Sequence, residues 1–208
     1  AEGRKFSCLT CYDASMAKAM ELAEIDTILI GDSLGMAIQG RDSTLPVTVE
    51  DMAYHTAAVR RGNQHALIMT DLPFMSYATL NDALQSARTV MQAGAQMVKL
   101  EGGAWLAETV QVMTRNGIPV CVHLGLTPQS VNVFGGYKLQ ARTREAADKL
   151  IADCKAVVEA GAAILLLECV PAQLGQEISA LFPEIPPFET SPPPCCSLLV
   201  EPLYSECL

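Results

Sequence analysis

Five hydrophobic segments of the chain each lead into a polar residue that could take part in chemistry. These residues are Asp32, Asp71, Glu101, His123 and Glu168. In a parallel α/β barrel, side chains at the carboxyl ends of successive strands meet at one mouth, although they lie far apart in the sequence. The pattern therefore predicts that the five side chains share one site.

Asp32, Asp71 and Glu101 are candidate ligands of a metal ion. Carboxylate oxygens are the hard ligands that Mg²⁺ prefers, and a set of three leaves coordination positions open for water and substrate oxygens. Each acid alone could instead cap the helix that follows its strand, which is the role we expect for Asp13. Acids after three successive strands favour a magnesium site over separate caps.

The other candidates are a lysine, a histidine and a further acid. Lys99 and Glu101 lie two residues apart, so on a strand they project to the same face. We expect Lys99 either to form a salt bridge with Glu101 or Asp71, or to neutralise a carboxylate of the substrate. His123 could be a hydrogen-bonded structural residue, and we interpret it as a contact of the substrate. Glu168 is the candidate general base, with a helix cap or an ion-pair partner as its alternative roles.

A metal ion, a lysine, a histidine and a carboxylate base, without a nucleophilic Ser or Cys arrangement, suit the chemistry of a 2-oxo acid. Such an acid can chelate Mg²⁺ through its carboxylate and keto oxygens. The ion then stabilises the enolate that forms when a base removes the neighbouring proton. The residue types therefore predict enolate chemistry, and they leave aldol-type addition, C–C cleavage and isomerisation open.

A repeated unit of helix, glycine, strand and acid positions these residues. Residues 91–103 and 157–169 are close to copies of each other. The hydrophobic runs predict strands that alternate with helices, at residues 6–12, 27–31, 66–70, 97–100, 119–124 and 163–167. This alternation predicts a parallel sheet, either a βα barrel or an open α/β layer. The barrel is favoured because no GxGxxG follows any of the first strands and the sequence contains no GxxxxGK[ST].

Local signals predict where the helices begin and end. Thr48 with Asp51, and Thr79 with Asp82, have the spacing of a capping box, and the helices that follow are expected to end near residues 61 and 93. Three glycines fall where a helix should end in a left-handed residue before the next strand, namely Gly94, Gly117 and Gly161. The repeat therefore has defined boundaries.

Charge and hydropathy exclude several classes of protein. The 208 residues carry a formal net charge of −9, whereas nucleic-acid and anionic-membrane surfaces need clustered Lys and Arg. The most apolar stretch, residues 162–170, is too short to span a bilayer, and the sequence does not open with a signal-peptide pattern. We expect a soluble, intracellular protein whose partners are small molecules, with no nucleic acid and no membrane.

The eight cysteines predict neither a disulfide scaffold nor a metal site. Cys8 and Cys11 form a CxxC, but positions three apart on a strand face opposite sides. Cys121, Cys154 and Cys169 lie in apolar surroundings, which is typical of core thiols. We therefore expect these five cysteines to serve packing.

Several longer blocks of the sequence are distinctive. They cover residues 31–62, 71–79, 98–103, 123–140 and 165–171. The blocks closely resemble the ketopantoate hydroxymethyltransferase family, and the resemblance extends from about residue 6 to residue 181. It implies an α/β fold, a TIM (βα)₈-type barrel of the phosphoenolpyruvate mutase and isocitrate lyase group, of which the first six βα units are evident in this chain.

The resemblance also implies a reaction and its site. The family transfers a hydroxymethyl group from 5,10-methylenetetrahydrofolate to 3-methyl-2-oxobutanoate, an early step of pantothenate and coenzyme A biosynthesis. Matching positions imply Mg²⁺ at Asp32, Asp71 and Glu101, and Glu168 as the proton acceptor. The positions implied at the oxo acid are Asp32, Ser33, Asp71 and Lys99. The family further implies a homo-oligomer, commonly a decamer, in the cytoplasm, or in mitochondria if the source is eukaryotic.

The sequence departs from the family after about residue 182. We therefore expect a barrel domain at residues 1–181 and an irregular tail, rich in proline and cysteine and without a strand, at residues 182–208. A barrel without its seventh and eighth strands cannot close, so the first and sixth strands would be exposed edges. The alternative to an active transferase is a truncated, catalytically inactive fragment of the same family.

Overall fold

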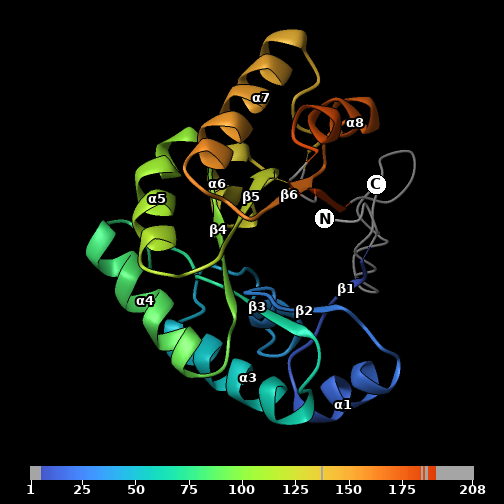
Figure 1. Cartoon of the computed structure of the whole chain (residues 1–208), viewed down its shortest axis with the longest axis vertical. Coiled ribbons are helices and arrows are strands. Elements are labelled where there is room, and N and C mark those ends of the chain that lie inside the picture. Colours follow the sequence, from blue (N-terminus) through green and yellow to red (C-terminus); the bar gives the residue numbers. More distant parts are fainter. Residues whose placement is uncertain (1–5, 137, 184, 186, 191–208) are drawn as a thin grey trace. The chain divides into compact units, whose positions relative to one another are not determined.

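The structure is a computed structural model that describes residues 6–136, 138–183, 185 and 187–190. The chain divides into two compact units, one that ends at Lys99 and one that begins at Leu100. Within each unit, parallel strands alternate with helices (Figure 1). Strand β4 (Met97–Glu101) carries the chain from the first unit into the second.

The first unit is built on parallel strands that pair in the order of the sequence. β1 pairs with β2, β2 with β3, and β3 with the start of β4. The other strands are β1 (Cys8–Thr10), β2 (Thr27–Ile30) and β3 (Leu67–Asp71), and the helices are α1 (Ala14–Leu22), α2 (Leu34–Ala37), α3 (Val49–Gly62) and α4 (Leu80–Gln92). Helix α3 packs on β2 and β3 and against α1 and α4. Every residue of β2 is buried, as expected of a parallel strand covered on both faces.

Side-chain caps fix the starts of α1, α3 and α4, as the sequence predicts. The Asp13 carboxylate accepts a hydrogen bond from the backbone at the start of α1. Thr48 and Asp51 form a reciprocal capping box on α3, with hydrogen bonds of 3.0 and 3.1 Å. At the start of α4, the Thr79 side chain accepts a hydrogen bond of 3.2 Å from the backbone N–H of Asp82, which is one half of the predicted capping box. At the other end of α4, Gly94 has a φ of +123°, so the predicted glycine turn is confirmed.

The second unit repeats the pattern with its own set of parallel strands. β6 pairs with β5 on one side and with β7 on the other. The strands are β5 (Val120–Gly125), β6 (Ile164–Glu168) and β7 (Pro187–Thr190), and the helices are η1 (Ala104–Leu106), α5 (Ala107–Arg115), η2 (Pro128–Ser130), α6 (Val131–Phe134), α7 (Arg144–Glu159) and α8 (Ala172–Leu181). Gly117 and Gly161 have positive φ values of 79° and 107°, as predicted. Helix α7 packs on β5 and against α5.

The six predicted strands are confirmed, each to within two residues at either end. The expectation of no strand after residue 182 was wrong. β7 begins at Pro187 and pairs in parallel with β6, with Leu165 opposite Pro187 and Glu168 opposite Thr190. Proline is tolerated at the first position of a strand, and four residues are too few to produce a visible alternation. Strand β6 is therefore paired on both sides and is not the exposed edge that the sequence predicts. The rest of the predicted tail, residues 191–208, lies outside the described residues.

The cysteine and membrane expectations can be compared with the described residues. Cys8, Cys11, Cys121 and Cys154 are buried thiols, which confirms their place in the core, whereas Cys169 is partly exposed. Among the helices of the described ranges, none is both long and apolar enough to cross a membrane.

Candidate active site

In the first unit, the end of β3 and the middle of β4 hold a buried ion pair. Lys99 lies opposite Asp71 in the strand register, and its Nζ is 2.5 Å from Asp71 Oδ1. Both side chains are about as buried as the apolar core, at 4% and 3% exposure. The other carboxylate oxygen of Asp71 accepts a hydrogen bond of 3.0 Å from the backbone of Asp32, which follows β2 and is also buried. The predicted salt bridge between Lys99 and Asp71 is confirmed.

Ser33, the other predicted contact of the oxo acid in this unit, has a partner that sequence reasoning missed. The Tyr12 hydroxyl lies 2.8 Å from Ser33 Oγ, and the Tyr12 carbonyl oxygen lies 2.7 Å from a ring nitrogen of His55. Gly31 leaves room for this arrangement, since a Cβ there would lie 2.7 Å from Ser33 Oγ. A tyrosine just beyond β1, a strand neighbouring β2, was the available signal.

Cys8 on β1 lies close enough to the ion pair to experience both of its charges. Burial raises the pKa of the Cys8 thiol to about 12, while Lys99 acts to lower that pKa and Asp71 to raise it. A thiol with such a pKa stays protonated near neutral pH and is a poor nucleophile. The interpretation of Cys8 as a packing residue is therefore confirmed.

In the second unit, a histidine lies between two glutamates. His123 Nδ1 is 3.2 Å from Glu101 Oε1, and His123 Nε2 is 3.0 Å from Glu168 Oε2. The second oxygen of Glu101 accepts a hydrogen bond of 2.9 Å from the backbone N–H of Gln129. Glu101 and Glu168 are the last residues of their strands, whereas His123 lies inside β5, which continues to Gly125. The structure thus brings together three of the predicted site residues, and Gln129 is a contact that the sequence did not reveal.

The backbone around Glu168 is closely constrained. Gly125 lies opposite Glu168 in the register with a φ of +88°, and a Cβ there would lie 2.3 Å from the Glu168 carbonyl oxygen. That oxygen accepts a hydrogen bond of 2.9 Å from the backbone N–H of Leu126. Cys169, the next residue, has a φ of +50°, which is costly for a residue with a side chain. Backbone strain of this kind is common at functional sites, so the strained Cys169 supports Glu168 as a candidate functional residue.

The predicted magnesium ligands are divided between the units, with Asp32 and Asp71 in the first and Glu101 in the second. Within the residues that the structure describes, no group of three or more His, Cys, Asp or Glu is placed to hold a metal ion. The set of three ligands therefore stays a prediction. Its donor chemistry fits a cation, because carboxylate oxygens are the hard ligands that Mg²⁺ prefers.

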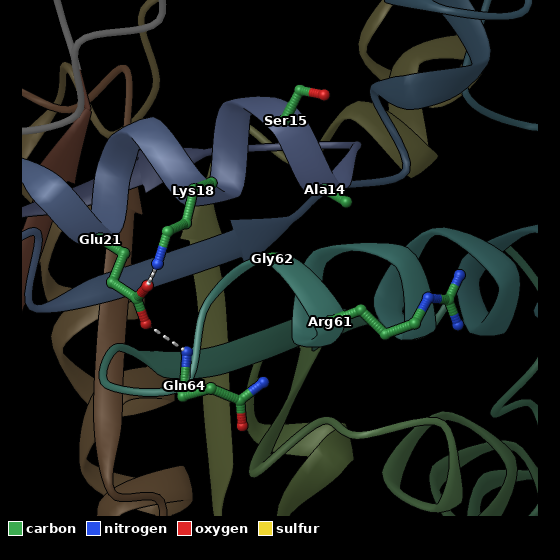
Figure 2. A pocket seen from close by; sticks show the side chains of 7 residues that line it. All are labelled: Ala14, Ser15, Lys18, Glu21, Arg61, Gly62 and Gln64. Carbon is green, nitrogen blue, oxygen red and sulfur yellow. Dashed lines mark hydrogen bonds and ion pairs between the residues drawn. The ribbon is translucent and has the colours of Figure 1, made fainter.

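A surface pocket lies away from these strand ends. It has a volume of about 630 Å³, and its lining comes from α1 and from the end of α3 and the residues after it. Figure 2 shows Lys18 directed toward Glu21 along α1, with the backbone of Gln64 donating to the same carboxylate. The lining includes none of the predicted site residues, and Lys18 is paired and largely exposed. The strand ends therefore remain the candidate site.

Comparison with known proteins agrees with the blocks of sequence. The sequence model of ketopantoate hydroxymethyltransferase matches residues 1–186. The chain belongs to the ketopantoate hydroxymethyltransferase family. It is 92% identical over 186 residues to the 3-methyl-2-oxobutanoate hydroxymethyltransferase of Acinetobacter baumannii (strain AYE), covering 89% of this chain and 69% of that protein. The enzyme of the same name from Psychrobacter sp. (strain PRwf-1) is 66% identical over 178 residues, which cover 86% of this chain and 66% of that protein.

Solved structures of low sequence identity share the fold of this family member. A 2,3-dimethylmalate lyase, described as a member of the PEP mutase/isocitrate lyase superfamily, aligns with a TM-score of 0.69 at 15% identity, covering 93% of this chain and 67% of that chain. A phosphonopyruvate hydrolase aligns with a TM-score of 0.70 at 13% identity, covering 90% and 67%. This likeness confirms the predicted fold class, an α/β fold of the TIM-barrel type.

Proposed function

We propose that this chain transfers a hydroxymethyl group from 5,10-methylenetetrahydrofolate to 3-methyl-2-oxobutanoate and gives 2-dehydropantoate. Relatives at 92% and 84% identity bear the name of this hydroxymethyltransferase, which supports the proposal. The observation that carries it is the partly exposed carboxylate of Glu168 at the end of β6, whose Oε2 lies 3.0 Å from Nε2 of the buried His123. A base for enolate formation needs such a position, because it must reach a substrate carbon.

Glu168 is the proton acceptor in this proposal. The C3–H bond of the oxo acid breaks, the proton goes to the Glu168 carboxylate, and the electron pair forms the C2–C3 double bond of the enolate. C3 of the enolate then forms a bond to the methylene carbon of the folate, and water supplies the hydroxyl oxygen. Both C–N bonds of that carbon break, and the two nitrogens take one proton from Glu168 and one from water as tetrahydrofolate leaves. The Glu168 side chain is 25% exposed, compared with 3% for His123 and Glu101, so it is the group of the three with access to a ligand.

Lys99 provides the positive charge for the carboxylate of the oxo acid. Its ammonium is held by Asp71 at 2.5 Å, so its position is set before a substrate arrives. Asp32, Asp71 and Glu101 would hold Mg²⁺, which when bound supplies positive charge for the enolate oxygen. Ser33 completes the contacts of the oxo acid in this proposal.

Product formation tests the proposal. We would incubate the purified chain with Mg²⁺, the oxo acid and the folate, and measure 2-dehydropantoate by mass spectrometry for the wild type and Glu168→Gln. Loss of a general base lowers such rates by about 10²–10⁴-fold. Equal rates for the two proteins would rule out Glu168 as the base.

A truncated, inactive member of the family is the second candidate. The observation that favours it is that the family match ends at residue 186, before the last residues of the given sequence. A chain that binds the oxo acid but forms no product would support this candidate. We also propose, from the family resemblance, a homo-oligomer in the cytoplasm with small molecules as ligands, and sedimentation of the purified chain tests its assembly.

A further inference from the structure

We propose that His123 is a positioning residue that holds the Glu168 carboxylate in place, and that Glu101 orients its ring. The proposal rests on the role of Glu168 as the proton acceptor. His123 Nε2 is 3.0 Å from Glu168 Oε2, and Nδ1 is 3.2 Å from Glu101 Oε1. An imidazole ring has two nitrogens, and here each has a carboxylate oxygen as its neighbour.

This geometry assigns His123 a different task from the substrate contact that the sequence suggests. A hydrogen bond from the ring to an oxo acid would have to replace one of the two carboxylate contacts. The ring is 2% exposed, so a ligand has little access to it. His123 therefore acts on the substrate through Glu168.

The ring can hold Glu168 because its own surroundings are fixed. Glu101 Oε2 accepts the backbone N–H of Gln129 at 2.9 Å, so the carboxylate that orients the ring is tied to helix η2. The His123 carbonyl oxygen accepts the backbone N–H of Gly102 at 3.0 Å. A histidine whose second nitrogen meets a carboxylate has a fixed ring orientation. The buried backbone thus fixes Glu101 and His123, and His123 in turn positions the more exposed Glu168 side chain.

Two amide substitutions at His123 test the contacts of its two ring nitrogens separately. The amide of His123→Gln extends toward the position of Nε2, whereas the shorter amide of His123→Asn reaches only the side of Nδ1. We would measure exchange of the C3 proton of 3-methyl-2-oxobutanoate in D₂O with Mg²⁺ at saturating oxo acid, and measure oxo-acid affinity by calorimetry. Misplacement of a catalytic group by about 1 Å costs roughly 10²-fold in rate.

The proposal predicts that His123→Asn loses about 10²-fold in the saturated exchange rate. His123→Gln should retain most of that rate, and both variants should bind the oxo acid as the wild type does. Two results would overturn it. One is that His123→Asn exchanges as fast as His123→Gln, and the other is that the variants lose oxo-acid affinity at an unchanged saturated rate, which is the result for a substrate contact.

Spectra of the ring nitrogens keep this test independent of turnover. The three histidines can be labelled with ¹⁵N, and His123→Gln identifies the His123 signals. The Nε2 signal should move in Glu168→Gln and the Nδ1 signal in Glu101→Gln, whether or not any protein exchanges the proton. Unmoved signals would overturn the positioning role. Wild-type exchange rates in Glu168→Gln would instead overturn the proposed base.

Discussion

The two glutamates that contact His123 differ in how firmly they are held. They end two copies of the same sequence repeat, yet Glu101 is 3% exposed in its side chain and Glu168 is 25% exposed. Both oxygens of Glu101 have a hydrogen-bonding neighbour, His123 on one side and the Gln129 backbone on the other. The comparison teaches that one repeat can supply both a fixed acid, which organises its surroundings, and a more accessible acid, which can react.

The largest effect on stability is expected from a third acid, Asp71, when its cation is removed. Lys99→Met leaves the buried Asp71 carboxylate without its ammonium partner, and breaking a buried ion pair in this way costs about 3–5 kcal/mol. Urea unfolding of the wild type and the variant measures this loss. Asp71→Asn combined with Lys99→Met is the matched control, because it removes both charges and should recover part of the stability. A loss below about 1 kcal/mol in Lys99→Met would mean that the pair behaves like a surface salt bridge.

The comparison of the two glutamates is tested directly by the same substitution at each. Glu101→Gln removes an acceptor from a buried cluster, and we expect a loss of about 1–3 kcal/mol in the free energy of unfolding. Glu168→Gln should cost less than about 1 kcal/mol, because its side chain is partly exposed to water. Chemical denaturation of both variants under one set of conditions measures the difference. Equal losses would contradict the division into a fixed and an accessible acid.

A helix cap outside the site provides a control, because its loss should lower stability without changing the proposed reaction. Thr48→Ala removes one half of the capping box of α3 and should cost about 1 kcal/mol. Thr79→Ala, at the start of α4, is the matched variant. Both should leave C3 proton exchange per folded molecule unchanged. An effect of either cap on that exchange would show that the site depends on more than the strand ends.

The smallest effect is expected from acids at the surface as the pH falls. Hydrogen bonds from Lys18 and from the Gln64 backbone lower the pKa of Glu21 from 4.5 to about 2, and the Thr48 backbone lowers the pKa of Asp51. A lowered pKa in the folded state contributes stability above the unfolded-state pKa and loses it as the pH falls through the folded-state value. The urea concentration at the unfolding midpoint should therefore decrease as the pH is lowered from 4.5 to about 2. Glu21→Gln should flatten this decline, and an unchanged profile in that variant would contradict the assignment.

Much of the fold follows from local signals in the sequence. The apolar runs are short and bounded by glycines and caps, so β2 and β6 lie where hydrophobicity predicts them. β7 could not be predicted in this way, because its four residues begin with proline and their pairing depends on β6. The pairing with β6 makes these four residues a strand, and no pattern in their own sequence predicts it.

The contacts within the candidate site were only partly predictable from the sequence. The period of two along β4 placed Lys99 on the face of Glu101, and Lys99 does meet an acid, Asp71. The role of His123 could not be derived in the same way, because the side chains around it come from β4 and β6 and their directions depend on packing. The Tyr12 contact with Ser33 also joins residues 21 apart, and a hydroxyl contact of this kind leaves no periodic signal.

The central claim is that Glu168 removes the C3 proton of the oxo acid. The most direct test is Mg²⁺-dependent exchange of that proton in D₂O, followed by NMR for the wild type beside Glu168→Gln, with the folate left out. We predict exchange in the wild type that requires Mg²⁺ and falls by about 10²–10⁴-fold in Glu168→Gln. Exchange at the same rate in both proteins, or none in a folded wild type that binds the oxo acid, would contradict the account.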